Sequence, residues 1–164
     1  GDDHDDSVTS GHEGQAYGHH LSRASACNVS SHGHWLQNRP MARPEFTVSD
    51  NVSTLPEQTH LEQSLYAYSY TVSIENTGDV LAQLIGRHWE IVDANGQLQT
   101  VDGLAVVGHQ PVLAPGQSFQ YSSWAQIGTP QGTMRGRFLC VTEGCEIFHA
   151  EVAEFLLADS ASLH

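Results

Sequence analysis

The sequence contains no lysine, and its six arginines face nineteen aspartate and glutamate residues. The formal net charge is −13 at pH 7. Because a chain of this sign repels a phosphate backbone, we expect no nucleic acid as a direct partner. The chain also lacks an apolar run near the ~18 residues that a membrane helix needs. Its first residues are polar and acidic, without the apolar core of a signal peptide, so no membrane partner is expected.

Paired cysteines are missing as well. Cys27 lies far from Cys140 and Cys145, and these two have no second pair beside them. Such spacing fits neither a zinc framework nor a disulfide scaffold. We interpret the cysteines as reduced and the protein as cytoplasmic.

Residues 1–40 differ in composition from the rest of the chain. They hold six of the eleven histidines, with many serines, glycines and aspartates, and show neither an apolar period of 2 nor one of 3.6 residues. One interpretation is a non-native leader ahead of a natural start at Met41. The other is a disordered, histidine-rich tail that binds metal loosely. The first is favoured because Met41 follows at once, and residues 41–164 are then the domain.

The remainder of the chain shows β patterns and no helical stripe. Residues 45–52 indicate an edge strand, 53–64 a loop, and the alternation from Tyr68 to Ile74 a strand with one wet face. Further strands are predicted at 80–84, 88–92, 97–101, 119–122, 134–141 and 147–157, separated by turn signals such as Asn-Gly and Pro-Gly. Short strands at this spacing predict an antiparallel β-sandwich of immunoglobulin or fibronectin type III kind. Its predicted core is Tyr70, Val72, Ile74, Trp89, Ile91, Phe119, Tyr121, Phe138 and Phe155.

An ordered series of motifs then points to a family. The motifs are Arg87-His88-Trp89, Asp93-x-x-Gly96, Gly103-x-x-Val106-Val107-Gly108-x-x-Pro111, Leu113-x-Pro115-Gly116, Phe119-x-Tyr121-x-Ser123, Gly132-x-Met134-x-Gly136, Phe148, Phe155 and Leu163-His164. Together they resemble the ApaG domain over residues 45–164. The family's glycine-rich loop reads G-x-G-V-V-G, and here Ala105 replaces the middle glycine.

The resemblance implies a fibronectin-type sandwich in a bacterial cytoplasmic protein, with a genetic association to cobalt and magnesium resistance. Related domains in eukaryotic F-box and polymerase-delta-interacting proteins suggest a protein-binding module. We therefore expect a non-enzymatic module with an unidentified protein partner and no cofactor. The chain lacks a G-x-S-x-G elbow, which agrees with a protein that is not an enzyme.

The loop at residues 103–108 supports two interpretations. A dinucleotide-binding loop needs a helix after it, whereas a proline-containing turn follows here, so a structural loop is favoured. The alternative is a nucleotide or pyrophosphate site made by Gly103, Val106 and Gly108 with Arg87 and either Arg135 or Arg137, and such a site could also hydrolyse its ligand. A second alternative, divalent-metal binding, would use scattered histidines without ligand spacing, and no metal is expected.

The expected recognition surface is the connection at residues 102–117 together with Arg87 and His88. This connection is apolar for a loop, so it either packs under the rim of the sandwich or contacts a partner. Alternation puts Trp89 in the core and His88 outside it. Arginine and tryptophan are also the residues that most often anchor protein interfaces.

Overall fold

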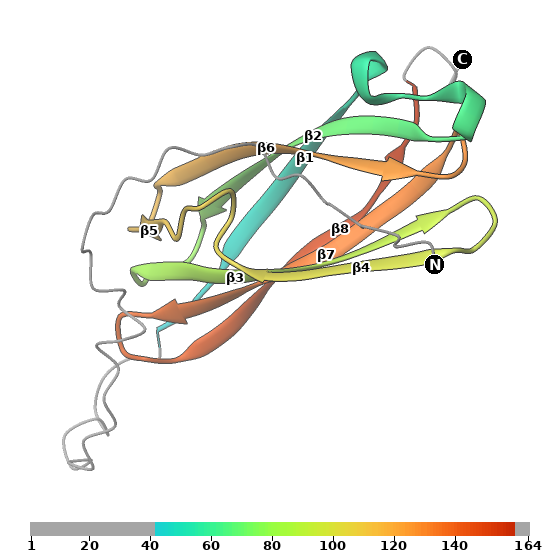
Figure 1. Ribbon diagram of the computed structural model, residues 1–164. Helices are drawn as coiled ribbons and strands as arrows, with labels where there is room; N and C mark the ends of the chain where they lie inside the picture. The colour runs from blue at the N-terminus through green and yellow to red at the C-terminus, as the bar shows by residue number, and fades with distance from the viewer. Residues whose placement is uncertain (1–41, 160–164) are drawn as a thin grey trace.

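The computed structural model describes residues 42–159, which form two antiparallel sheets facing each other (Figure 1). One sheet has the order β1-β2-β6 and the other β4-β3-β7-β8, with β5 paired to the first residues of β3. The antiparallel β-sandwich predicted from the sequence is confirmed. The strands are β1 Phe46–Thr54, β2 Tyr66–Asn76, β3 Ala82–Asp93, β4 Leu98–Leu104, β5 Val112–Leu113, β6 Ser118–Ile127, β7 Gly132–Thr142 and β8 Ile147–Leu157.

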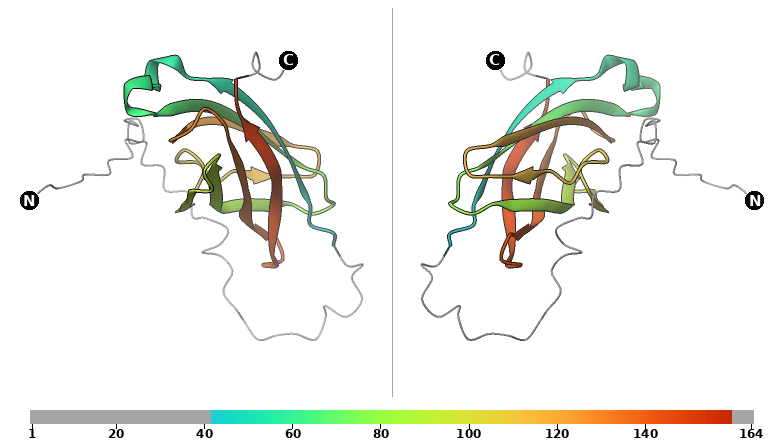
Figure 2. Two further views of the ribbon diagram at one scale, coloured as in Figure 1. Left: turned by 90° about the vertical axis from the view of Figure 1, so that its right-hand side faces the viewer. Right: turned by 90° about the vertical axis from the view of Figure 1, so that its left-hand side faces the viewer.

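The two layers are joined at one side and open at the other. β1 and β8 contact each other, which closes one side of the sandwich (Figure 2). β4 and β6 are the remaining edge strands of their sheets. Two short 3₁₀ turns, η1 Pro56–Gln58 and η2 Leu61–Gln63, occupy the predicted loop between β1 and β2. No helix in residues 42–159 is long and apolar enough to cross a bilayer.

The core follows from the alternation of apolar and polar residues along each strand. In β2, Tyr68, Tyr70, Val72 and Ile74 are buried while the residues between them are not fully so. All of the predicted core residues are buried except Phe119, which is partly buried and packs against the ring of His109. Phe119 lies near the start of β6, where the sandwich ends, so its ring has neighbours on fewer sides.

Trp89 forms the centre of the core. Its ring system makes edge contacts with Tyr70, Phe138 and Phe155, at centroid distances of 5.8, 5.7 and 6.2 Å. Gly136 on β7 pairs directly with it, and a Cβ there would lie 2.2 Å from the carbonyl oxygen of His88 and 2.6 Å from the Trp89 ring. The tryptophan therefore fits only because β7 carries no side chain at this point.

A β-bulge in β3 changes which residues face the core. The register between β3 and β7 shifts between Leu84 and Gly86, so one extra residue is inserted on β3. Leu84 faces inward before the bulge, and Trp89 and Ile91 face inward after it. Without this insertion, residues 84 and 89 would point to opposite faces. A second shift, between Met134 and Gly136, marks a bulge in β8.

The outer face of the three-stranded sheet is almost without charge. Its outward positions are Thr47, Ser49, Asn51 and Ser53 on β1, Ala67, Ser69, Thr71, Ser73 and Glu75 on β2, and Ser118, Gln120, Ser122, Trp124 and Gln126 on β6. Thr71 and Ser122 share a hydrogen bond of 2.7 Å across the two strands. Hydroxyl and amide groups thus cover this face, although the chain as a whole is strongly acidic.

The predicted connection at residues 102–117 is only partly a loop. β4 continues to Leu104, and β5 interrupts the remainder, so the prediction of a continuous loop is wrong. The Asp93–Gly96 turn is confirmed, with Gly96 at φ +80° and the Asp93 carboxylate accepting the N–H groups of Asn95 and Gln97 at 2.9 Å. The predicted Pro-Gly turn also forms, with Gly116 at φ +86°.

We predict that Gly136→Ala destabilises the domain strongly. The added methyl would meet backbone and a packed indole, neither of which can move freely, so the loss is about 3 kcal/mol and about 10 °C in melting temperature. Gly144→Ala is the matched control, because its Cβ would meet nothing closer than the Thr142 hydroxyl at 3.9 Å. Thermal unfolding of both variants checks this. Equal melting temperatures would show that Trp89 does not depend on Gly136.

Candidate functional site

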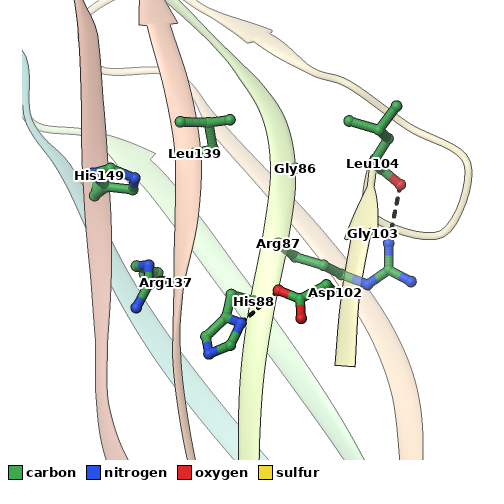
Figure 3. Close-up of a pocket in the computed structure, with 9 residues that line it drawn as sticks. All are labelled: Gly86, Arg87, His88, Asp102, Gly103, Leu104, Arg137, Leu139 and His149. Atoms are coloured by element: carbon green, nitrogen blue, oxygen red, sulfur yellow. Dashed lines mark hydrogen bonds and ion pairs between the residues drawn. The ribbon is translucent and has the colours of Figure 1, made fainter. Parts of the chain in front are cut away.

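A hollow of about 400 Å³ lies on the outer face of the five-stranded sheet (Figure 3). It is named here the outer-face hollow. Four neighbouring strands supply its lining, which consists of Gly86, Arg87, His88, Asp102, Gly103, Leu104, Arg137, Leu139 and His149. Gly86 has no side chain and therefore leaves the middle of the face low, while Leu104 and Leu139 stand on either side of it.

Strand register explains why these residues meet. One ladder row places His88 between Asp102 on β4 and Arg137 on β7, and the next row places Gly86 between Leu104 and Leu139. His149 on β8 extends the second row, because it pairs with Leu139. Residues at one ladder position share a face of the sheet, so residues up to 63 positions apart in sequence line one hollow.

Charged groups of both signs surround the hollow. The His88 Nδ1 atom lies 2.5 Å from an oxygen of Asp102, and its Nε2 atom lies 3.7 Å from Glu90. Glu90 also accepts a hydrogen bond of 2.5 Å from Arg135, and this guanidinium holds the pKa of the carboxyl below its ordinary value. Arg137 differs, since it forms no ion pair with any residue in the 42–159 range. An exposed, unpaired guanidinium on an acidic chain can still bind a carboxylate of another molecule.

Arg87 has a different role from its neighbour His88. Its Nη1 atom donates to the carbonyl oxygens of Leu104 and Ala105, at 3.0 and 2.6 Å. The side chain crosses β4 at Gly103, where a Cβ would lie 2.9 Å from Nη1 (Figure 3). Burial raises the pKa of the inward-facing Tyr70, and a hydrogen bond with Ser123 and the charge of Arg87 oppose part of this rise. Arg87 therefore lies on the opposite face of β3 from His88 and holds the start of the following loop.

The loop after β4 is a tight turn rather than an anion cradle. Val106 and His109 exchange backbone hydrogen bonds of 2.8 and 3.0 Å, and the two residues between them have positive φ angles, as in a type I′ turn. The N–H of Ala105 donates to the carbonyl of Ile85 at 2.8 Å. The Ala105 and Val106 N–H groups are thus bonded inside the protein. Val106 is fully buried, whereas Val107 is 42% exposed.

The structure brings some of the predicted site residues together and separates others. Arg87, His88 and Gly103 line the outer-face hollow, although Arg87 does so from the far side of its strand. Arg135 lies one row further along the same sheet and is paired with Glu90. Two further predicted residues lie outside the hollow: Val106 packs in the core, and Gly108 lies at the tip of the turn. The connection was expected either to pack under the rim of the sandwich or to contact a partner, and Val106 packs inside the sandwich.

Sequence reasoning missed the part of the hollow that lies over the middle and far strands of the sheet. Gly86, Leu139 and His149 were not predicted as members of the recognition surface, whereas Asp102 and Leu104 belong to the predicted 102–117 connection and Arg137 was named only as an alternative to Arg135. Alternation shows that residues such as Arg137 and Leu139 face the same side of a strand, but it does not show which strand lies beside them. The pairing of β3 with both β4 and β7 is the missing information.

Metal ligands and reactive thiols are not gathered at this site. In the part of the chain that the structure describes, no three histidine, cysteine or acidic residues could hold a metal ion together. Burial raises the pKa of the Cys140 thiol to about 12, so this free cysteine is a poor nucleophile at neutral pH. Cys145 is disulfide-bonded, so the interpretation of reduced cysteines is wrong for this residue.

Comparison with known proteins identifies the family. The sequence profile described as ApaG domain matches residues 56–142. Protein ApaG of Ralstonia nicotianae is 52% identical over 124 residues, which cover 76% of this chain and all of that protein. The chain belongs to the ApaG domain family. The ApaG protein of Bordetella pertussis is 47% identical over 128 residues, covering 78% of this chain and 98% of its own.

A solved structure agrees with this assignment. The crystal structure of a Bordetella pertussis protein described as ApaA is 47% identical to this ApaG domain and has a TM-score of 0.69. The match covers 74% of this chain and 98% of that one. The resemblance predicted from the ordered motifs is therefore confirmed at the level of family and fold.

We predict that Gly103→Ala releases Arg87 from the loop. The new methyl would occupy the space of the guanidinium, so both hydrogen bonds to the loop carbonyls are lost at a cost of about 1–2 kcal/mol. In an Arg87→Ala background the same change has no guanidinium to displace and costs less than about 0.5 kcal/mol. Chemical denaturation of the four proteins in this cycle measures the coupling. Additive effects would show that Gly103 and Arg87 act independently.

A second prediction concerns Ala105, which has φ +65°. A left-handed conformation strains an alanine by about 1 kcal/mol, and glycine relieves this at a partly offsetting entropic cost, so Ala105→Gly gains about 0.5 kcal/mol of stability. Ala114→Gly is the control: Ala114 is not among the positive-φ residues, so only the entropic cost applies and stability falls. A denaturation midpoint that rises for Ala105→Gly and falls for Ala114→Gly supports the argument. A fall in the midpoint for both variants contradicts it.

Proposed function

We propose that this ApaG domain is a non-enzymatic protein-binding module that recognises its partner with the outer-face hollow. The observation that carries the proposal is the unpaired guanidinium of Arg137 beside the exposed side chains of Leu139 and Leu104. Leu104 is 73% exposed, which is unusual for an apolar side chain beside a depression. An apolar centre with flanking charges is the usual composition of a protein recognition surface.

The lining of the hollow favours binding over catalysis. It contains no serine, threonine, cysteine or lysine that could act as a nucleophile. His88 and Asp102 form a pair, but a general base also needs a positioned group to activate, and the lining offers none. A cytoplasmic location, which the family resemblance implies, belongs to the same proposal.

The nucleotide alternative gains less support. A phosphate site at the 103–108 loop would need backbone N–H groups directed at the ligand. Those of Ala105 and Val106 donate to carbonyl groups of the protein, and Arg87 holds two further carbonyls. Metal binding, which the association with cobalt and magnesium resistance suggests, also gains less support, because no set of three ligand residues is gathered between residues 42 and 159.

We predict that Arg137→Ala and Leu139→Ser each weaken partner binding at least tenfold while the melting temperature changes by less than about 4 °C, the effect of about 1 kcal/mol in a chain of this size. Affinity capture with the full chain, followed by titration of the captured protein, measures this. Ser49→Ala, on the outer face of the other sheet, is the control and keeps full binding.

Two results would contradict the proposal. One is a partner that binds both variants as well as the parent protein. The other is a saturable, micromolar response of the amides of residues 86–110 to GTP or pyrophosphate, which would favour the nucleotide alternative. Val106→Ser serves as a further comparison: because its side chain is buried, it should lower stability without changing the binding surface.

A further inference from the structure

β4 is an edge strand of seven residues. The order β4-β3-β7-β8 leaves its outer side without a strand among the described residues (Figure 1). All of its residues are exposed or half-buried, and Leu98 and Leu104 at its two ends are 56% and 73% exposed. An edge of this kind presents a row of backbone groups that another chain can bond to.

Strand register shows which backbone groups these are. Ala105 N–H donates to Ile85 O at 2.8 Å, and Asp93 N–H donates to Gln97 O at 3.1 Å. Both bonds belong to the β3–β4 ladder, in which hydrogen-bonded pairs alternate with unbonded ones. The odd-numbered residues of β4 therefore bond to β3. The N–H and C=O groups of the even-numbered residues, from Leu98 to Leu104, point away from the sheet.

The other edge strands carry devices that oppose pairing. β1 places the charged Asp50 on the side that faces β8, and β8 has a bulge near Glu154. At the two ends of β6, side chains contact other segments: His109 packs on Phe119, and Gln126 donates to Gln58 O at 2.9 Å. β4 has no lysine, proline or bulge, and its pairing with β3 is regular throughout. β4 thus lacks the inward charge of β1 and the bulge of β8, and it also borders the outer-face hollow.

We infer that β4 accepts an extended peptide segment as an additional antiparallel strand, with a basic side chain opposite Asp102 and apolar side chains opposite Leu98 and Leu104. The inference rests on the proposed protein-binding function and names how the partner binds. Asp102 contacts His88 through one carboxylate oxygen, but its side chain is 71% exposed and the chain carries a net charge of −13, so a basic residue is the complementary choice for the remaining oxygen. Backbone bonds would supply affinity and alternate side chains specificity.

Arg87 fixes where the added strand ends. Its guanidinium already binds the outward carbonyl of Leu104, so this acceptor is occupied. The outward groups of Thr100 and Asp102 remain for the peptide, with those of Leu98 at the other end. The outer-face hollow borders the same strand through Asp102 and Leu104, so a partner that pairs with β4 also reaches the hollow.

A substitution on the edge tests this without breaking the sheet. The Thr100 N–H points outward, so Thr100→Pro removes a donor that only an added strand would use. Val101→Pro is the contrasting variant, because its N–H bonds to β3 and its loss destabilises the domain. The probe is the acetylated, amidated heptapeptide Leu-Thr-Lys-Val-Thr-Val-Leu, titrated into the full chain and followed by amide shifts and hydrogen exchange.

We predict saturable shifts along β4 and at least tenfold slower exchange of the Thr100 and Asp102 amides on binding. Thr100→Pro should weaken the affinity for the peptide at least tenfold, and replacing the peptide's lysine by glutamate should do the same. If Thr100→Pro fails to fold, the parent protein with a peptide N-methylated at its bonding positions gives the same test. Undiminished binding of the N-methylated peptide, or shifts confined to β1 or β6, would overturn the inference.

Two further outcomes separate this inference from the proposed function. If Arg137→Ala abolishes capture of the partner and Thr100→Pro does not, the hollow is the binding surface and strand addition is rejected. The parent protein could instead form a dimer as its concentration rises. If Thr100→Pro abolishes this dimer and leaves peptide binding unchanged, the β4 edge pairs with a second copy of the chain and the inference is rejected. Loss of both peptide and partner in Thr100→Pro supports the inference.

Discussion

The structure depends on the contact between Trp89 and Gly136. The indole lies against a bare backbone on the neighbouring strand, and Tyr70, Phe138 and Phe155 contact it from the other sides. Because the interior is close-packed, this contact favours the register in which Trp89 faces inward opposite a residue without a side chain. His88 and Arg137 are the immediate neighbours of this pair in sequence, so their outward position follows from the same contact.

Glycine has the opposite effect on the other face of the sheet. Gly136 makes room for a side chain inside the sandwich, whereas Gly86 leaves a depression outside it. The β-bulge before Gly86 connects the two, because it reverses the alternation and turns that glycine outward. Leu104, Leu139 and the ionisable side chains of His88, Asp102, Arg137 and His149 then remain around an empty centre. The hollow is therefore a by-product of how the core is packed.

Much of the fold could be predicted from periodicity, while the site could not. Alternation in β2 and around Trp89 indicated the core correctly, and the Asn-Gly and Pro-Gly turns were found from local chemistry. The bulge at residue 85 has no such local signal, so the inward position of Leu84 on the same side as Trp89 could not be predicted. Arg87 was grouped with His88, although strand alternation turns these adjacent residues to opposite faces. Arg137 and Asp102 lie 35 positions apart, and only the register of three strands brings them to one hollow.

The outer faces of the two sheets differ in the number of ionised side chains that they carry. Hydroxyl and amide groups dominate one broad face, and ionised groups are concentrated on the other. A charged molecule therefore meets ionised groups of both signs, among them Arg137, on one side, and hydroxyl and amide groups on the opposite one. Dissolved salt, with a screening length of about 8 Å at physiological strength, alters long-range approach to the ionised side and leaves the neutral side almost unaffected. The salt dependence of an association rate therefore shows which face of the domain a charged binding molecule approaches.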